Sequence, residues 1–287
     1  YAVVSYQTAY LKYYYPVEFM AALMTSVVEM PNKVAEYISV CRQMGIQILP
    51  PDINRGMYGF SVDNGAIRYA LSAIKSIGRP VIEGIVRERE EHGEYTSLKN
   101  FVERNIVQLN KRVVENLIKA GAMDCLEGNR RQKMTVYMQI IDSINQEKKH
   151  TMAGQMSLFD IVPEEDKKEF EIRMPHAAEY PDDVILTFEK EVLGIYLSGH
   201  PLERYRSMLE KMITAKTSDF QPDDETGIPE VYDNQNVIVG GMITDKTIKY
   251  TKNNKVMAFL TLEDLVGTVE IVVFPRDYEK CQMLINE

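Results

Sequence analysis

The residue types best suited to binding chemistry lie around a glycine between two helical stretches. Residues 71–86 predict two short helices joined by a tight turn at Gly78, with Pro80 in the first turn of the second helix. We expect Gly78 to adopt a positive φ, which glycine does without steric cost. Such a turn aims the N–H groups of residues 77–79 outward at a helix N-terminus, where they can bind a phosphate. The candidate phosphate-binding residues of this turn are Lys75, Ile77, Gly78 and Arg79.

A second unit of the same kind follows the first. Asn110 is a preferred N-cap, apolar residues recur after it at helical spacing, and Gly121 can end the helix. Residues 129–131 open a third helix. The basic residues of this second unit, which are also candidates for phosphate contact, are Lys111, Arg112, Lys119, Arg130 and Arg131. The basic pair resembles tandem helix-hairpin-helix motifs, whose family role is to hold the DNA backbone. Helical hairpins with solvated charges are the alternative.

A short apolar pattern stands inside the polar, acidic stretch of residues 151–185. Leu158 and Phe159 are costly to expose to water unless a partner covers them. In a peptide-in-groove complex they would fill apolar subsites, while the Gln155 amide would fix the orientation. The pattern resembles the pentapeptide with which bacterial polymerases bind the sliding clamp, and its residues are Gln155, Met156, Ser157, Leu158 and Phe159. The alternative is that Leu158 and Phe159 attach this stretch to their own domain.

From residue 236 the apolar residues recur at a spacing of two, which predicts β-strands. The pattern resembles the opening of an OB-fold, a five-stranded barrel that binds single strands through basic and aromatic side chains. The candidate single-strand-binding residues are Lys246, Lys249, Tyr250, Lys252, Lys255 and Phe259. For each residue alone, a solvated hairpin side chain is an equal alternative. Because about three strands precede Glu287, we expect an incomplete barrel that leaves Leu260, Ile271 and Val273 partly uncovered.

Charge is distributed unevenly along the 287 residues. The formal net charge of −9 argues against nucleic acid when the chain is taken as a whole. However, thirteen Lys and Arg oppose nine Asp and Glu in residues 68–133, whereas eight oppose nineteen in residues 157–235. The sequence therefore predicts separate modules with separate partners.

Cysteine and histidine spacing does not indicate a metal site or a disulfide framework. The three cysteines, Cys41, Cys125 and Cys281, form no CxxC pair, and the four histidines have no ligand spacing with each other or with a cysteine. This argues against a metal enzyme or hydrolase, and against a bacterial DNA ligase, which should show a cysteine zinc cluster and a lysine nucleophile motif. No apolar run suggests a membrane span and no secretory signal is present, so we expect a cytoplasmic protein.

The order of these motifs resembles the family of bacterial DNA polymerase III alpha subunits over essentially the whole chain. Residues 6–12 (YQTAYLK) and 189–201 (EKEVLGIYLSGHP) also carry the resemblance. It implies a C-terminal fragment whose catalytic aspartates lie in a palm domain upstream. No catalytic residue, metal ligand or cofactor is therefore expected here, and magnesium is expected for the parent polymerase. The implied partners are duplex and single-stranded DNA, the sliding clamp, the rest of the polymerase chain and other replisome subunits. A stand-alone adaptor for DNA and the clamp is the alternative.

Together these patterns predict an α+β multidomain chain that is mainly helical at first and ends in a truncated OB-like β module. The predicted segments are residues 1–49, the helical end of a fingers-like region; residues 50–150, the helix-hairpin-helix domain; residues 151–185, the linker with the pentapeptide; residues 186–235, a helical and acidic connector; and residues 236–287, the partial OB-fold.

Overall fold

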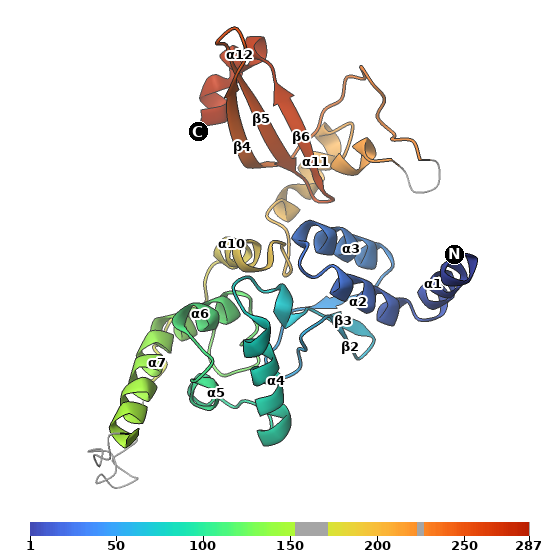
Figure 1. Ribbon diagram of the computed structural model, residues 1–287. Helices are drawn as coiled ribbons and strands as arrows, with labels where there is room; N and C mark the ends of the chain where they lie inside the picture. Colours follow the sequence, from blue (N-terminus) through green and yellow to red (C-terminus); the bar gives the residue numbers. More distant parts are fainter. Residues whose placement is uncertain (153–171, 223–226, 287) are drawn as a thin grey trace. The chain divides into compact units, whose positions relative to one another are not determined.

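The computed structural model describes residues 1–152, 172–222 and 227–286 (Figure 1). The chain forms two compact units, residues 1–198 and residues 199–287, which we name the hairpin unit and the sheet unit. The division falls inside the predicted connector of residues 186–235. Among the described helices, none combines the length and the apolarity needed to cross a bilayer.

Three helices open the hairpin unit: α1 (Ala2–Tyr14), α2 (Pro16–Ser26) and α3 (Pro31–Gln43). Pro16 and Pro31 each occupy the first turn of their helix, where the missing N–H removes no hydrogen bond. The side chains of α1 are not buried, whereas α2 and α3 contribute residues such as Met24 and Ile38 to the core.

A small three-stranded sheet follows in the order β1-β3-β2. Its strands are β1 (Ile48–Leu49), β2 (Ser61–Asp63) and β3 (Ala66–Arg68). β2 and β3 form an antiparallel hairpin, and β1 pairs with β3 in parallel. Asn64 and Gly65 both have positive φ in the connecting turn, which matches the hairpin expected from the Asn-Gly dipeptide.

The rest of the hairpin unit is helical. Its elements are the 3₁₀ turn η1 (Leu71–Ala73) and the helices α4 (Arg79–His92), α5 (Leu98–Asn105), α6 (Lys111–Lys119), α7 (Arg130–Met152) and α10 (Asp182–Leu193). The predicted first helix of the first hairpin is thus only one 3₁₀ turn. One apolar core joins these elements to α2 and α3, and its fully buried members include Leu71, Ile82 and Val114. α10 packs against α6 although about seventy residues separate them in the sequence (Figure 1).

The sheet unit contains short helices, an antiparallel sheet and one final helix. Its elements are η3 (Glu203–Tyr205), α11 (Arg206–Met212), η4 (Thr217–Phe220), β4 (Met242–Tyr250), β5 (Val256–Glu263), β6 (Thr268–Val273) and α12 (Pro275–Asn286). The strand order is β4-β5-β6. Residues 236–241 are not in a strand, so the β pattern predicted from residue 236 begins six residues later, at Met242.

Helix α12 covers one face of this sheet. Tyr278 and Ile285 of the helix pack on Ala258 and Leu260 of β5 in a small separate core. Leu260 is only 5% exposed, so the expectation that it lacks cover was wrong, while Ile271 and Val273 are half-buried. The cover comes from a helix, rather than from the further strands of a barrel.

Candidate nucleic-acid interface

The turn between η1 and α4 differs from the prediction at one residue. Gly78 is extended, with φ −75° and ψ 151°, and serves as the N-cap of α4, so the expected positive φ was wrong. Ser76 carries the positive φ instead, at 67°. The reason is that an N-cap residue takes β-region dihedrals, so the chain must reverse before Gly78. Pro80 lies in the first turn of α4, as predicted.

Two hydrogen bonds hold this turn in place. The Lys75 N–H donates to the Val192 carbonyl of α10 at 2.9 Å, and the Lys75 carbonyl accepts from Nδ2 of Asn116 on α6 at 2.7 Å. A left-handed conformation costs a residue such as Ser76 about 1–2 kcal/mol. The two bonds immediately before Ser76 offset that cost.

The N-terminus of α4 is open to an anion. The backbone N–H groups of Ile77, Gly78 and Arg79 donate no hydrogen bond to any residue that the structure describes. Gly78 and Arg79 are exposed, while the Ile77 side chain is buried in the core. The Arg79 guanidinium donates to Glu83 at 2.7 Å and lies 4.9 Å from the centroid of the Tyr58 ring. Orphan donors at a helix N-terminus are a ready site for phosphate.

A pocket of about 510 Å³ lies beside this turn and brings the two hairpins together. Its lining includes Lys75 of the first hairpin and Lys111 and Arg112 of the second. Lys75 and Arg112 are exposed and pair with no acid in the described part of the chain. Lys111 donates to Asp142 at 2.8 Å, and both side chains are about half exposed. Three of the predicted phosphate-contacting cations therefore surround one cavity.

Lys119 lies against the acidic wall of the same pocket. Its ammonium is 3.0 Å from Glu115 and 3.0 Å from Glu191, and its side chain is only 12% exposed. Burial alone would lower the pKa of Lys119, but the hydrogen bonds to the two carboxylates raise it above its ordinary value. Lys75, Lys111 and Arg112 outnumber the two acids of the lining, Glu115 and Glu191, so the lining keeps a net positive formal charge. The contacts of Lys119 favour a role in joining α6 to α10 over one in contacting DNA.

Arg130 is also occupied within the protein. Its guanidinium is nearly buried and donates to both carboxylate oxygens of Asp124 at distances between 2.8 and 3.2 Å. It lies close over Gly121, whose φ of 77° ends α6. The Gly121 N–H donates to the Ile118 carbonyl and the next N–H to the Leu117 carbonyl, which is a Schellman arrangement. Gly121 thus ends the helix as predicted and leaves space for Arg130.

The N-terminus of α7 is already filled by an anion of the chain itself. The Glu179 carboxylate accepts from the N–H groups of Arg130 at 2.9 Å and Arg131 at 3.1 Å. Burial opposes ionisation of Glu179, but these N–H donors and the Arg130 charge hold its pKa below its usual range. Asn129 and Gln132 complete the start of the helix by exchanging hydrogen bonds, each side chain accepting from the other's N–H at 2.9 Å. The Arg131 side chain is exposed, but the backbone donors beside it are occupied.

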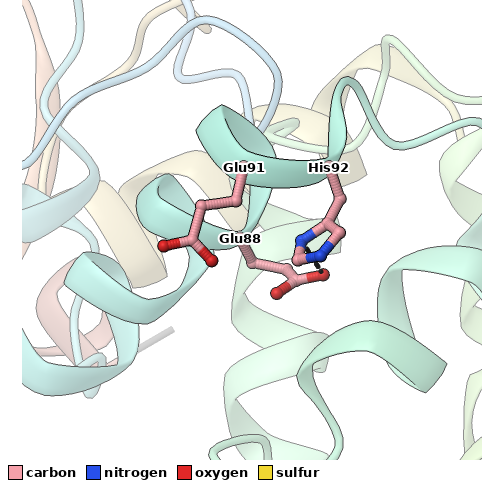
Figure 2. A group of neighbouring side chains, drawn as sticks. All are labelled: Glu88, Glu91 and His92. Atoms are coloured by element: carbon pink, nitrogen blue, oxygen red, sulfur yellow. Dashed lines mark ion pairs between the residues drawn. The ribbon is translucent and has the colours of Figure 1, made fainter.

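A group of possible metal ligands lies at the end of α4, where Figure 2 shows Glu88, Glu91 and His92 side by side. The Glu88 carboxylate pairs with Nδ1 of His92 at 3.1 Å and with Arg104 at 3.1 Å. Glu88 therefore already has two cationic or hydrogen-bonding partners. The arrangement ties the end of α4 to α5, and the spacing of i, i+3 and i+4 is the sequence signal that identifies it.

The candidates for single-strand binding fall on two faces of the sheet. Lys249 and Phe259 share the face opposite α12, and the Lys249 ammonium lies 4.6 Å from the centroid of the Phe259 ring. Lys246 pairs in register with Leu260 and so belongs to the α12 side, where its ammonium donates to the Ile285 carbonyl at 2.7 Å.

The remaining candidates lie at the end of the β4–β5 hairpin. Tyr250 is the last residue of β4 and is strongly exposed, while Lys252 and Lys255 belong to the turn. The structure thus brings only Lys249 and Phe259 together on an open face. The predicted clamp-binding residues 155–159 lie outside the described residues.

Three important residues of the hairpin unit were not predicted: Asn116, Val192 and Glu179. For Asn116 a signal exists, since it interrupts the apolar face formed by residues 113–118, and a polar residue at such a position needs a buried partner. Val192 acts through its backbone carbonyl and Glu179 lies in a polar stretch, so their side-chain types carry no comparable signal.

Residues 45–133 match the family model of the helix-hairpin-helix motif. The two linked hairpins and this match together identify a helix-hairpin-helix segment within the chain. The whole chain is also similar to proteins named DNA polymerase III subunit alpha. That of Saccharopolyspora erythraea is 36% identical over 97% of this chain and 23% of the relative, and that of Vibrio cholerae is 36% identical over 98% and 24%. That of Thermus aquaticus is 37% identical over 100% and 22%. The chain belongs to the DNA polymerase III alpha subunit family and spans about a quarter of the length of these curated relatives.

Proposed function

We propose that the hairpin unit holds the backbone of duplex DNA without reading its sequence. The observation that carries this proposal is the joining of two hairpins around one cationic pocket, next to an uncapped helix N-terminus. The N–H groups of Ile77, Gly78 and Arg79 would bind one phosphate, and Lys75 and Arg112 would bind phosphates beside it. Contacts to phosphates fix the position of a protein on DNA but do not discriminate between bases.

The family membership supports a role in DNA replication for this binding of the DNA backbone. In this proposal the chain serves as part of a cytoplasmic DNA-directed DNA polymerase, and it holds DNA while residues elsewhere in the polymerase chain carry the magnesium-dependent chemistry. It would work with that chain and with other replisome subunits. Primer extension with magnesium and all four nucleotides tests this division, because extension by the 287-residue chain alone would contradict it.

The pentapeptide of residues 155–159 supports a second, finer proposal, that the chain binds the bacterial sliding clamp. Leu158 and Phe159 would fill apolar subsites, and each buried side chain of this size contributes about 1.5–3 kcal/mol. The affinity of the whole chain for the clamp, measured by titration calorimetry, should therefore mostly be lost when Leu158 and Phe159 are both replaced by Ala. Unchanged binding by that variant would place the contact elsewhere.

The open face of the sheet unit supports weak binding of single-stranded DNA. Phe259 offers a ring for base stacking, and the Lys249 ammonium, which lies over this ring when no strand is bound, offers a charge for the backbone. Replacing Phe259 by Leu keeps the apolar volume but removes the stacking surface. We expect the affinity for a short single strand to fall in this variant, as measured by fluorescence anisotropy. Equal affinity for the variant and the unmodified chain would remove the sheet face from the proposal.

Salt titration tests the proposal for duplex DNA. The logarithm of the binding constant should fall linearly with the logarithm of salt concentration, with a slope of about −0.9 for each phosphate neutralised. Replacing Lys75 and Arg112 by Ala should weaken binding and reduce the size of the slope by about 0.9 for each of the two cations removed. The matched control replaces Lys33 and Lys99, exposed lysines that pair with acids of their own helices, and should keep the original slope. An unchanged slope in the Lys75 and Arg112 variant would contradict the proposal.

A further inference from the structure

The carbonyl groups at the end of α10 point to a role for this helix in the first hairpin. Gly194 ends α10 in a left-handed conformation, with φ 79°, and its N–H returns to the Lys190 carbonyl at 3.1 Å. Carbonyls in the last turn of a helix have no partner within it. Those of Val192 and Leu193 accept instead from the Lys75 N–H and, at 3.2 Å, from the Tyr69 hydroxyl. The hairpin therefore supplies the hydrogen bonds that the end of α10 lacks.

The position of α10 is itself fixed. The side chains of Val192 and Leu193 are each 2% exposed and belong to the main core. Glu189, which is 1% exposed, accepts from the N–H groups of Leu197 at 2.8 Å and Ser198 at 2.9 Å, and also from the Ser198 hydroxyl. These bonds fold the segment after α10 back onto the helix. The end of α10 is consequently a rigid support for whatever bonds to it.

Asn116 holds the Lys75 backbone through its carbonyl, whereas α10 holds it through its N–H. Asn116 is 7% exposed and its side chain donates to the Lys75 carbonyl, while the Val192 carbonyl of α10 accepts from the Lys75 N–H. Both backbone polar groups of Lys75 are thus bonded to elements outside the first hairpin. The next residue, Ser76, is the one held at a positive φ, and the open N–H groups follow directly after it. A change at Asn116 would release the Lys75 carbonyl, which precedes Ser76, and so allow Ser76 to leave its left-handed conformation.

We propose that Asn116 and α10 position the first hairpin for binding a phosphate, without contacting the DNA themselves. This inference rests on the proposed function. It extends the DNA-binding unit to residues 182–198, beyond the 45–133 that match the helix-hairpin-helix motif. It also gives a physical role to the EKEVLGIYLS part of the sequence, which contains Glu189 and the carbonyl of Val192.

The test replaces Asn116 by Ala in the whole chain and measures binding to a short duplex by anisotropy over a range of salt concentrations. We expect binding about tenfold weaker and a smaller salt slope, because the N–H groups no longer meet the phosphate in register. The second variant adds Ser76→Gly to Asn116→Ala. Glycine adopts a positive φ without the steric cost that serine has. We expect the double variant to recover most of the affinity and the original slope.

A matched control separates positioning from general stability. Asn105 is another buried asparagine of the hairpin unit, and its Nδ2 donates to the Phe101 carbonyl at 2.9 Å, away from the hairpin loop. Asn105→Ala should lower the melting temperature but keep the salt slope of the unmodified chain. Equal DNA binding by Asn116→Ala and the unmodified chain would overturn the inference, as would failure of Ser76→Gly to restore binding. If the unmodified chain does not bind duplex DNA at all, it is the proposed function that fails.

Discussion

The basic side chains of the hairpin unit differ in what they contact. Lys119 and Arg130 are largely buried and are bonded to acids of the same unit. Lys75 and Arg112 are exposed and have no acidic partner among the residues described. Breaking a buried pair leaves an uncompensated charge, which makes Lys119 and Arg130 structural, whereas an exposed cation can meet a phosphate at little cost. The sequence predicts positive charge at all four positions but not this division, because the partner Glu191 lies about seventy residues away from Lys119.

Glu179 provides a prediction with a defined pH dependence. Its pKa is lowered in the folded state, so its ionised form stabilises the fold above its ordinary value of 4.5. This contribution is lost as the pH falls through the lowered pKa. Glu179→Gln should therefore reduce the free energy of unfolding by about 1 kcal/mol at neutral pH. The difference from the unmodified chain should shrink below pH 4.5, as measured by urea unfolding at several pH values.

Glu127 is the matched control for this prediction. It is an exposed acid of the same unit that pairs with no other residue in the described ranges. Glu127→Gln should leave the free energy of unfolding unchanged within about 0.5 kcal/mol. If the loss of unfolding free energy in Glu179→Gln stays constant down to strongly acidic pH, the Glu179 charge does not stabilise the start of α7.

At the scale of elements, the end of α6 depends on a glycine for two reasons. Gly121 has a positive φ, and a Cβ at this position would overlap the guanidinium of the buried Arg130. Gly45 has a similar φ of 73° but nothing within 4 Å of the place of its Cβ. Gly45→Ala should therefore cost about 1–2 kcal/mol of stability, which is the conformational term alone. Gly121→Ala should cost about 3 kcal/mol or more, because the pair of Arg130 with Asp124 must also move.

The quantity to measure is the difference in unfolding free energy between these two variants, by chemical denaturation at one temperature. Because both replace a left-handed glycine by alanine, the comparison removes the conformational cost and leaves the effect on Arg130. Equal losses of stability at Gly45 and Gly121 would mean that Arg130 moves aside freely. In that case its ion pair with Asp124 would not stabilise the junction between α6 and α7.

The hairpin elements were largely predictable because their signals are local. The Asn110 side chain caps α6 by accepting from the Val113 N–H at 2.9 Å, as its type and position predict. The shift of the positive φ from Gly78 to Ser76 was not predictable, because the hydrogen bonds that stabilise it come from α6 and α10. Helix α12 was missed although Tyr278, Cys281 and Ile285 recur at helical spacing, since the preceding strands suggested that the β pattern would continue.

At the scale of the whole molecule, the proposed phosphate site is assembled from segments that are distant in the sequence. The open N–H groups belong to the start of α4, Asn116 belongs to α6, and the supporting carbonyl belongs to α10. The sequence predicts α+β content and paired hairpins, and these predictions are confirmed by the fold and by the match of residues 45–133. It does not predict which helix supports which loop, because that depends on tertiary packing. The residue-level roles in DNA and clamp binding stay predictions.

The most direct test of DNA binding by the hairpin unit compares two helix N-termini in one protein. The N–H groups of Ile77, Gly78 and Arg79 are open, whereas those of Arg130 and Arg131 are occupied by Glu179. Amide resonances from an ¹H–¹⁵N NMR titration with a short duplex report on both sites at once. On addition of DNA we predict large changes in the amide chemical shifts of residues 77–79, which disappear at high salt, and small changes at residues 130–131. Shifts confined to residues 130–131, or the absence of shifts at 77–79 when DNA is bound, would contradict the proposed grip.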